Sequence, residues 1–171
     1  MKFYNAIFFA ASCLSALPQD PVVIAENVSF STVANEMEIT APDGAIIEWG
    51  DFSIASSEAV HFLQPSPTAA VLNRVTSSIQ SQIHGLLQAN GNVILINPNG
   101  IIFGESAVIN TASLIASTFD VANESFLTDR KLEFSGVSSH YGLIDCEGTF
   151  TTNGDFIALG HSVTANGGSI E

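Results

Sequence analysis

The chain has 171 residues, of which 4 are Lys or Arg and 17 are Asp or Glu, giving a formal net charge of −13. This acidity argues against nucleic-acid binding, which depends on basic contacts to phosphate, and against settling on an anionic membrane surface. Because 46% of the residues are apolar, the composition also excludes a disordered chain. The length suits one domain, and a charged fraction of 12% with 13 Gly favours strands and turns over exposed helices.

The N-terminal residues 1–17 have the pattern of a secretory signal peptide. Lys2 supplies a positive charge, Ala6 to Leu17 form a short and largely apolar run, and polar residues begin after Pro18. The run is shorter than the ~20 residues that a membrane-spanning helix needs. We therefore expect export, with cleavage near Ala16; the alternative is a buried N-terminal segment.

Cysteine usage agrees with export and requires no disulfide. If Cys13 leaves with the signal peptide, Cys146 is alone, and its simplest interpretation is a small buried apolar residue. A second hypothesis makes Cys13 the lipidated residue of a lipoprotein, which the missing Leu three residues before it disfavours. The remaining residues 18–171 are expected to form one domain.

Beyond residue 20 the main signal is a series of short apolar segments separated by Gly and Asn. Such segments, bounded by turn-forming residues, are typical of strands. The segment 93–96 is apolar on both alternating faces, which predicts a strand buried on both sides with its outer face covered. The expected strands lie at 22–24, 45–47, 93–96, 101–103 and 156–159.

Two pairs of loosely similar segments suggest a solenoid repeat. Residues 84–87 resemble 141–144 in type, and residues 104–108 resemble 160–163, at offsets of 57 and 56. These offsets correspond to three turns of a solenoid with about 20 residues per turn. Residues 67–88 have a partly helical spacing, but their β-branched and Ser residues disfavour a helix, and we expect strand or loop with at most a short helical turn.

An ordered series of motifs identifies a family resemblance. The motifs are W-x-x-F-x-I at 49–54, V-x-F-x-Q-P at 60–65, LNRV at 72–75, S-x-I-x-G-x-L-x-A-N-G at 81–91, NPNGI-x-FG at 97–104 and L-x-AST at 114–118. Their order is far more specific than any one of them. The series resembles the N-terminal secretion domain of two-partner secretion exoproteins of the filamentous haemagglutinin type, clearly over residues 44–120 and more weakly over 25–165.

The resemblance implies an all-β fold, a right-handed parallel β-helix with an N-terminal cap and small extra-helical β elements. It also implies export through the periplasm to the cell surface or medium. The implied partner is an outer-membrane β-barrel transporter with periplasmic domains, for which this domain is the address and a folding nucleus. A host-cell or glycan receptor is a further expected partner.

Two features qualify the resemblance. Residues 64–67 read Gln-Pro-Ser-Pro where many members carry NPNL, so the chain looks like the adhesin branch that lacks this motif. Residues 166–171 lie where a further turn should begin, and open solenoid ends invite pairing. We therefore expect a fragment, a truncated gene or a split exoprotein.

The motifs supply the candidate site residues. In the NPNG tetrad, Pro fixes φ, Asn bonds nearby backbone and Gly permits positive φ. A tight turn explains these residues better than a direct contact with the transporter does. Arg74 is expected to pair with a carboxylate or cap backbone carbonyls. Aromatic packing in the core or cap is expected of Trp49, Phe52 and Phe62. The candidate transporter-recognition residues are Asn73, Arg74, Val75, Asn97, Pro98, Asn99, Gly100 and Ile101.

Enzyme interpretations find little support in the sequence. It contains no HExxH, Walker, GxSxG or GxGxxG motif, and no catalytic residue, metal site or cofactor is expected. His61, His84, His140 and His161 are scattered. The alternatives are a self-contained adhesin or carbohydrate-binding module and, third, a β-helix polysaccharide lyase, which would need more Lys and Arg than the chain supplies.

Overall fold

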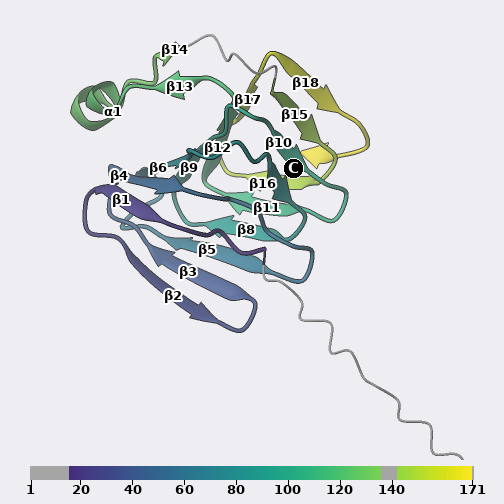
Figure 1. Cartoon of the computed structure of the whole chain (residues 1–171), viewed down its shortest axis with the longest axis horizontal. Helices are drawn as coiled ribbons and strands as arrows, with labels where there is room; N and C mark the ends of the chain where they lie inside the picture. The colour runs from purple at the N-terminus through teal and green to yellow at the C-terminus, as the bar shows by residue number, and fades with distance from the viewer. Residues whose placement is uncertain (1–15, 136–141, 171) are drawn as a thin grey trace, which may run out of the picture.

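The computed structural model describes residues 16–135 and 142–170, so the predicted signal peptide over residues 1–17 lies almost wholly outside the described residues. The chain winds as a β-solenoid in which strands of successive turns stack in parallel along three sheets (Figure 1). The expected all-β, parallel β-helix class is therefore confirmed. Antiparallel pairs occur at the N-terminal end and in one insertion.

The three sheets are named I, II and III in the order in which each turn visits them. Sheet I contains β2 (Ser29–Val33), β3 (Glu36–Thr40), β5 (Ala59–Leu63), β8 (Leu86–Ala89), β11 (Val108–Thr111), β16 (Thr149–Thr152) and β19 (Ser169–Ile170). Sheet II contains β1 (Val22–Ala25), β4 (Ala45–Trp49), β6 (Ala70–Val75), β9 (Asn92–Ile96), β12 (Ser113–Ser117) and β17 (Phe156–Leu159). Sheet III contains β7 (Ser81–Ile83), β10 (Ile101–Phe103), β15 (Leu143–Cys146) and β18 (Ser162–Ala165).

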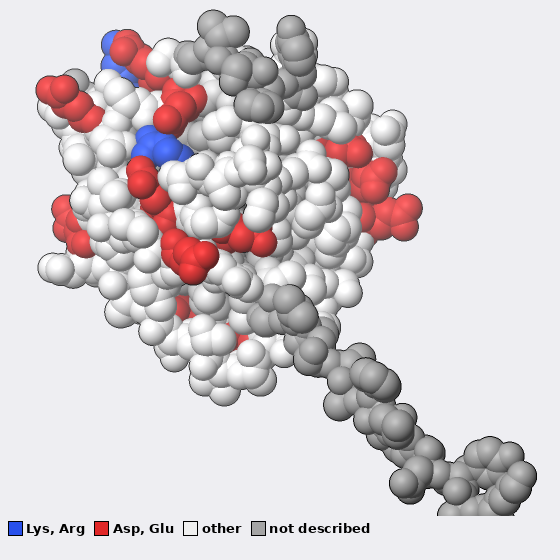
Figure 2. Space-filling model, viewed as in Figure 1, with Lys and Arg blue, Asp and Glu red and all other residues white. Residues whose placement is uncertain are grey.

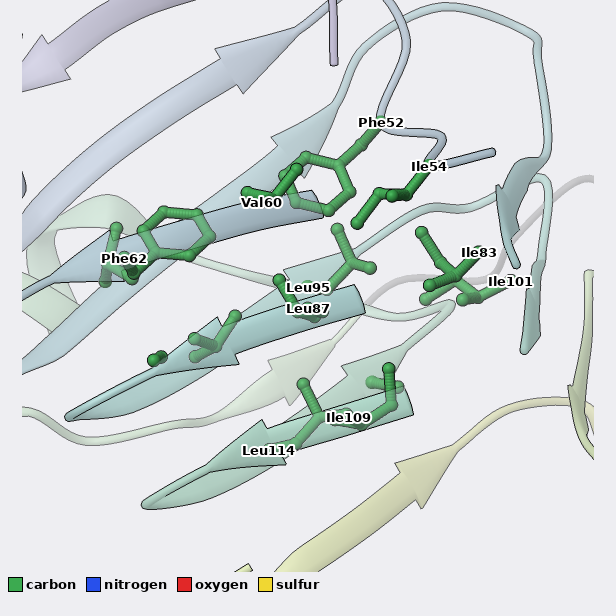
Figure 3. Close-up of a cluster of buried hydrophobic side chains, with 14 of the residues drawn as sticks. Phe52, Ile54, Val60, Phe62, Ile83, Leu87, Leu95, Ile101, Ile109 and Leu114 are labelled. Atoms are coloured by element: carbon green, nitrogen blue, oxygen red, sulfur yellow. The ribbon is translucent and has the colours of Figure 1, made fainter. Parts of the chain in front are cut away.

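The core is built from apolar side chains that stack directly on one another from turn to turn. In sheet I, one such row consists of Met37, Val60, Leu87, Ile109 and Phe150, all of them buried. Figure 3 shows side chains of this kind pointing inward from the facing sheets. Parallel register places each apolar residue over its predecessor, and Cys146, the cysteine among the described residues, is a free thiol buried in this core. The five predicted strands are all strands in the structure.

A short insertion covers the outer face of sheet II. It consists of the antiparallel pair β13 (Asp120–Val121) and β14 (Phe134–Ser135) with the helix α1 (Asn123–Asp129) between them, and Figure 1 shows it standing beside the stacked turns. Phe126 of α1 packs in one cluster with Ile94 and Ile96 of β9. The prediction that residues 93–96 are buried on both faces is confirmed, since the insertion supplies the outer cover. The helix itself was not predicted.

The predicted repeat is wrong in its register. Leu86 pairs with Val108 in sheet I, whereas Leu143 belongs to sheet III, so segments 84–87 and 141–144 are not equivalent positions of the solenoid. The insertion lengthens the turn that contains β12 and β15. A constant sequence offset applied across this insertion therefore matches residues that lie in different sheets of the solenoid. Tyr141 of that predicted repeat lies outside the described residues.

The N-terminal end of the core is closed by antiparallel elements. β1 runs antiparallel to β4, the β2–β3 hairpin continues sheet I, and Gln19 forms an antiparallel bridge with Asp51. Phe30 of β2 packs edge-to-face on Trp49, with ring centroids 5.8 Å apart. Leu17 is buried in the same core. A reversed strand direction ends the parallel ladder, as the resemblance to a capped β-helix led us to expect.

Candidate functional site

The Asn97-Pro98-Asn99-Gly100 segment forms a closed turn between β9 and β10. The Gly100 N–H donates to the Asn97 carbonyl at 3.0 Å, and the Asn97 side-chain Oδ1 accepts from the Asn99 N–H at 2.9 Å. Gly100 has φ +115°, and a Cβ there would lie 2.7 Å from the Leu143 carbonyl oxygen. Asn97, Asn99 and Gly100 therefore each have a geometric role in the turn.

The Asn side chains of this turn also bind the corner of the preceding turn. Asn97 is fully buried, and its Nδ2 donates to the Ile79 carbonyl at 2.9 Å and to the Ser81 hydroxyl at 3.0 Å. The Asn99 Nδ2 donates to the Ser77 carbonyl at 2.8 Å. Side-chain amides thus pair corner carbonyls that lie outside the strand ladders and tie this corner to the NPNG turn.

The LNRV motif lies on β6, one turn before the NPNG tetrad. The pairs Asn73–Leu95 and Arg74–Ile96 place the motif beside the strand that leads into the tetrad. Asn73 points into the core, where its Oδ1 accepts from the indole Nε1–H of Trp49 at 3.0 Å; both side chains are fully buried. A buried hydrogen bond thus links the motif to the aromatic residues of the cap.

The expected cap aromatics lie in the core near the N-terminal end. Trp49 and Phe52 are fully buried, with ring centroids 5.4 Å apart in an edge-to-face arrangement. Phe62 is also buried, farther along sheet I, and Figure 3 shows it pointing inward with Phe52. These positions fit packing and leave little surface for a ligand to stack on.

Arg74 points to the outer face of sheet II and holds the insertion. Its guanidinium lies 2.9 Å from the Asp120 carboxylate and 3.4 Å from that of Glu48, and it donates to the Val121 carbonyl at 2.8 Å and the Asn123 side chain at 2.9 Å. The Arg74 side chain is only 12% exposed. The structure thus shows both expected roles, carboxylate pairing and carbonyl capping, in one residue.

A second arginine holds the other end of the insertion. Arg130 follows α1 in the left-handed conformation, pairs with Asp43 at 3.1 Å and lies 5.1 Å above the Phe126 ring. The pKa of the Asp43 carboxyl is lowered by the hydrogen bond from the Ala70 backbone and by the Arg130 guanidinium. Arg74 and Arg130 therefore both hold the insertion against the solenoid through ion pairs and hydrogen bonds.

The described residues offer no catalytic constellation. Burial, with a smaller effect from Asp145, raises the pKa of the Cys146 thiol to about 11, so this thiol is protonated at neutral pH and is a poor nucleophile. Over residues 16–135 and 142–170, no three His, Cys, Asp or Glu side chains gather as metal ligands would. In the same ranges no helix reaches the length and hydropathy that crossing a membrane requires.

The structure brings the two predicted motifs together but buries most of their side chains. Of the eight candidate recognition residues, only Arg74, Pro98 and Asn99 are partly exposed. Acidic side chains are scattered over the face in Figure 2 and basic ones are few. Sequence reasoning missed the Trp49–Asn73 bond and the insertion, because neither leaves a local pattern.

Comparisons with known proteins agree on one family. Residues 18–171 match the family described as TPS secretion domain. A heme/hemopexin-binding protein of Haemophilus influenzae strain Rd is 42% identical over 106 residues, which are 61% of this chain and 12% of that protein. Another heme/hemopexin-binding protein from the same species is 45% identical over 91 residues, 53% of this chain and 10% of that protein. The chain thus matches only a small part of the length of these curated relatives.

A solved structure shows the same fold. The crystal structure of the HMW1 secretion domain from Haemophilus influenzae superposes with a TM-score of 0.83 at 36% sequence identity, covering 90% of this chain and 42% of that one. Sequence and fold therefore agree over nearly the whole chain, and the chain belongs to the TPS secretion domain family of two-partner secretion exoproteins.

Proposed function

We propose that this domain is the secretion signal of an exported protein. It is recognised in the periplasm by an outer-membrane β-barrel transporter with periplasmic domains. The observation that carries the proposal is the family match over residues 18–171, together with the fold of the HMW1 secretion domain. The domain acts by being recognised and catalyses no reaction. Its destination is the cell surface or the medium.

The architecture supports a second part of this function, the nucleation of solenoid folding. Antiparallel strands close the N-terminal end, while at the other end β19 pairs with β16 alone among the described strands. A strand that follows in the chain lies near β19 and can add in parallel to its free edge, as β19 adds to β16. Folding that starts at the cap proceeds toward the C-terminus, which is the direction that suits a chain emerging N-terminus first.

The NPNG turn is the place to test recognition. We propose that Pro98 and Asn99, which are partly exposed, contact the transporter, while buried Asn97 shapes the turn. Changing both Asn97 and Asn99 to Ala should block surface delivery in cells that carry the cognate transporter. The matched control is Asn153→Ala, at an exposed Asn-Gly turn that lies farther along the chain. Normal delivery of the double variant would refute the role of the turn.

Folding and recognition can be separated in the same assay. Asn99→Ala removes the partly exposed bonds from Nδ2 to the Ser77 carbonyl and to Asn97 Oδ1. Asn97→Ala removes the bond to the buried Ser81 hydroxyl as well and should destabilise the domain. If recognition reads the exposed turn, Asn99→Ala lowers delivery while circular dichroism of the purified protein stays unchanged. Delivery that falls only with stability would show that the turn matters through the fold alone. Binding of a glycan array by the purified domain would instead favour the adhesin alternative.

A further inference from the structure

A buried carboxylate lies beside the first described residue of the chain. Glu58 is 5% exposed, and its Oε1 accepts the backbone N–H of Ala16 at 3.0 Å, while Oε2 accepts the backbone N–H of Ala55 at 2.9 Å. The turn at residues 55–58 that carries Glu58 is closed by its own backbone bond at 2.9 Å. The carboxylate is therefore held in place and aimed at the Ala16 nitrogen.

The chain belongs to the folded domain from Ala16 onward. Leu17 is 4% exposed and packs in the main core, and Gln19 forms its bridge to Asp51. A cut after Leu17 would remove this core side chain, and it would also place a bulky residue at the position before the cut. A cut before Ala16 keeps every one of these contacts.

The sequence before Ala16 suits such a cut. Signal peptidases require small residues at the first and third positions before the cleaved bond. Cleavage between Ser15 and Ala16 places Ser15 and Cys13 at these positions, directly after the apolar run. Cleavage one bond later would place Leu14 at the third position, which the same rule disfavours.

We propose that export cleaves the Ser15–Ala16 bond and that the new α-ammonium group of Ala16 forms an ion pair with Glu58. Hydrolysis of this peptide bond consumes one water, leaves the Ser15 carboxylate on the signal peptide and frees the Ala16 amine, which is protonated at neutral pH. The charge then appears on the nitrogen that already lies 3.0 Å from Oε1. A hydrogen bond from a neutral amide to a buried carboxylate becomes an ion pair between two charged groups.

This ion pair would form only after the signal peptide is removed, so cleavage would contribute a contact to the N-terminal cap. A buried carboxylate is costly without a cationic partner, and the α-ammonium group supplies that partner where the Ala55 N–H already holds Glu58 in place. The uncleaved chain has a neutral amide at this position and lacks the pair. Cleavage therefore adds an ion pair to a cap whose other contacts the structure already shows, so the inference concerns processing and does not depend on recognition by the transporter.

The first test reads the N-terminal residue. The full chain is expressed in a Gram-negative host that lacks the partner transporter, and the periplasmic protein is examined by intact mass and N-terminal sequencing. We expect Ala16 as the first residue. A start at Leu17 or Pro18, a lipidated Cys13 or an uncleaved chain would each overturn the proposal. A failed transporter interaction leaves this readout unchanged, so the two proposals fail independently.

The second test reads the ion pair. Because Lys131 is the lysine that remains beyond the signal peptide, a Lys131→Arg background confines cyanate carbamylation to the α-amine. Carbamylation should lower the thermal midpoint by about 3 °C when Glu58 is present, and should have no effect after Glu58→Gln. The matched control Glu105→Gln, at an exposed carboxyl, should keep the full decrease. An equal decrease with and without Glu58 would refute the pair.

A further measurement covers the case in which Glu58→Gln does not fold. In the folded Lys131→Arg protein, an α-ammonium paired with a carboxylate should react with cyanate several-fold more slowly than in the same chain unfolded in guanidinium chloride. Equal rates in the two states would show a free amine and would overturn the pair without any variant at Glu58.

Discussion

Replacing Asn73 with Ala should destabilise the domain, because it removes the hydrogen-bond acceptor of the buried Trp49 side chain. The Trp49 indole N–H donates to Asn73 Oδ1 at 3.0 Å, and both side chains are fully buried. In the variant this N–H has lost its acceptor and lies too deep for water to reach it. Phe30 and Phe52 pack on the Trp49 ring edge-to-face and hold it in place.

The expected cost has two parts. A buried donor left without a partner costs about 1–3 kcal/mol, and the space vacated by the amide adds roughly 1 kcal/mol. A total of about 2–4 kcal/mol corresponds to a decrease in Tm of about 5–15 °C for a chain of this size. The control Asn110→Ala, on the exposed side of β11, should change stability by less than about 0.5 kcal/mol.

The assay is thermal and guanidinium unfolding followed by far-UV circular dichroism, with and without Trp49→Phe. In the Phe background no indole N–H exists, so Asn73→Ala should cost at least about 1 kcal/mol less than in the parent. Equal costs in the two backgrounds would refute the bond to Trp49 as the cause and leave the packing of the Asn73 side chain and its Nδ2 bond to the Ile94 carbonyl.

Three further outcomes are expected. Arg74→Met should cost about 1–2 kcal/mol, because the lost bonds are only partly replaced by water, and limited proteolysis should then cut the insertion faster; an unchanged digestion pattern would contradict its anchoring role. Gly100→Ala should cost about 1–3 kcal/mol because of its positive φ and the close Leu143 carbonyl, and wild-type unfolding curves would contradict this strain. The pKa of the Cys146 thiol is raised to about 11 in the folded state, so between about pH 9 and 11 the unfolded state loses this proton first. The free energy of unfolding should therefore fall as pH rises through that range. Cys146→Ala should remove this part of the pH dependence, and an unchanged profile would show that the thiol is not its source.

The sequence predicted the parts of this fold that depend on local pattern. Short apolar segments bounded by turn-forming residues predicted the strands, and the all-apolar segment 93–96 predicted a strand covered on both faces. The ordered motifs predicted the family, and the chemistry of the NPNG tetrad predicted its turn. The inferences about the strands and the turn use residues that are neighbours in the chain, where backbone preferences act directly. The family was inferred from the order of motifs over residues 49–118.

Contacts between distant segments were decided by the tertiary structure alone. The sequence offset of the solenoid is interrupted by the insertion, so pattern matching assigned residues 141–144 to the wrong face. The acceptor of the Trp49 N–H and the partners of Arg74 lie one or more turns away. The Glu58 carboxylate, which accepts the Ala16 N–H, also comes from a distant segment, 42 residues along the chain. Parallel stacking brings such groups together, because each turn places residues far apart in sequence one strand spacing apart in space.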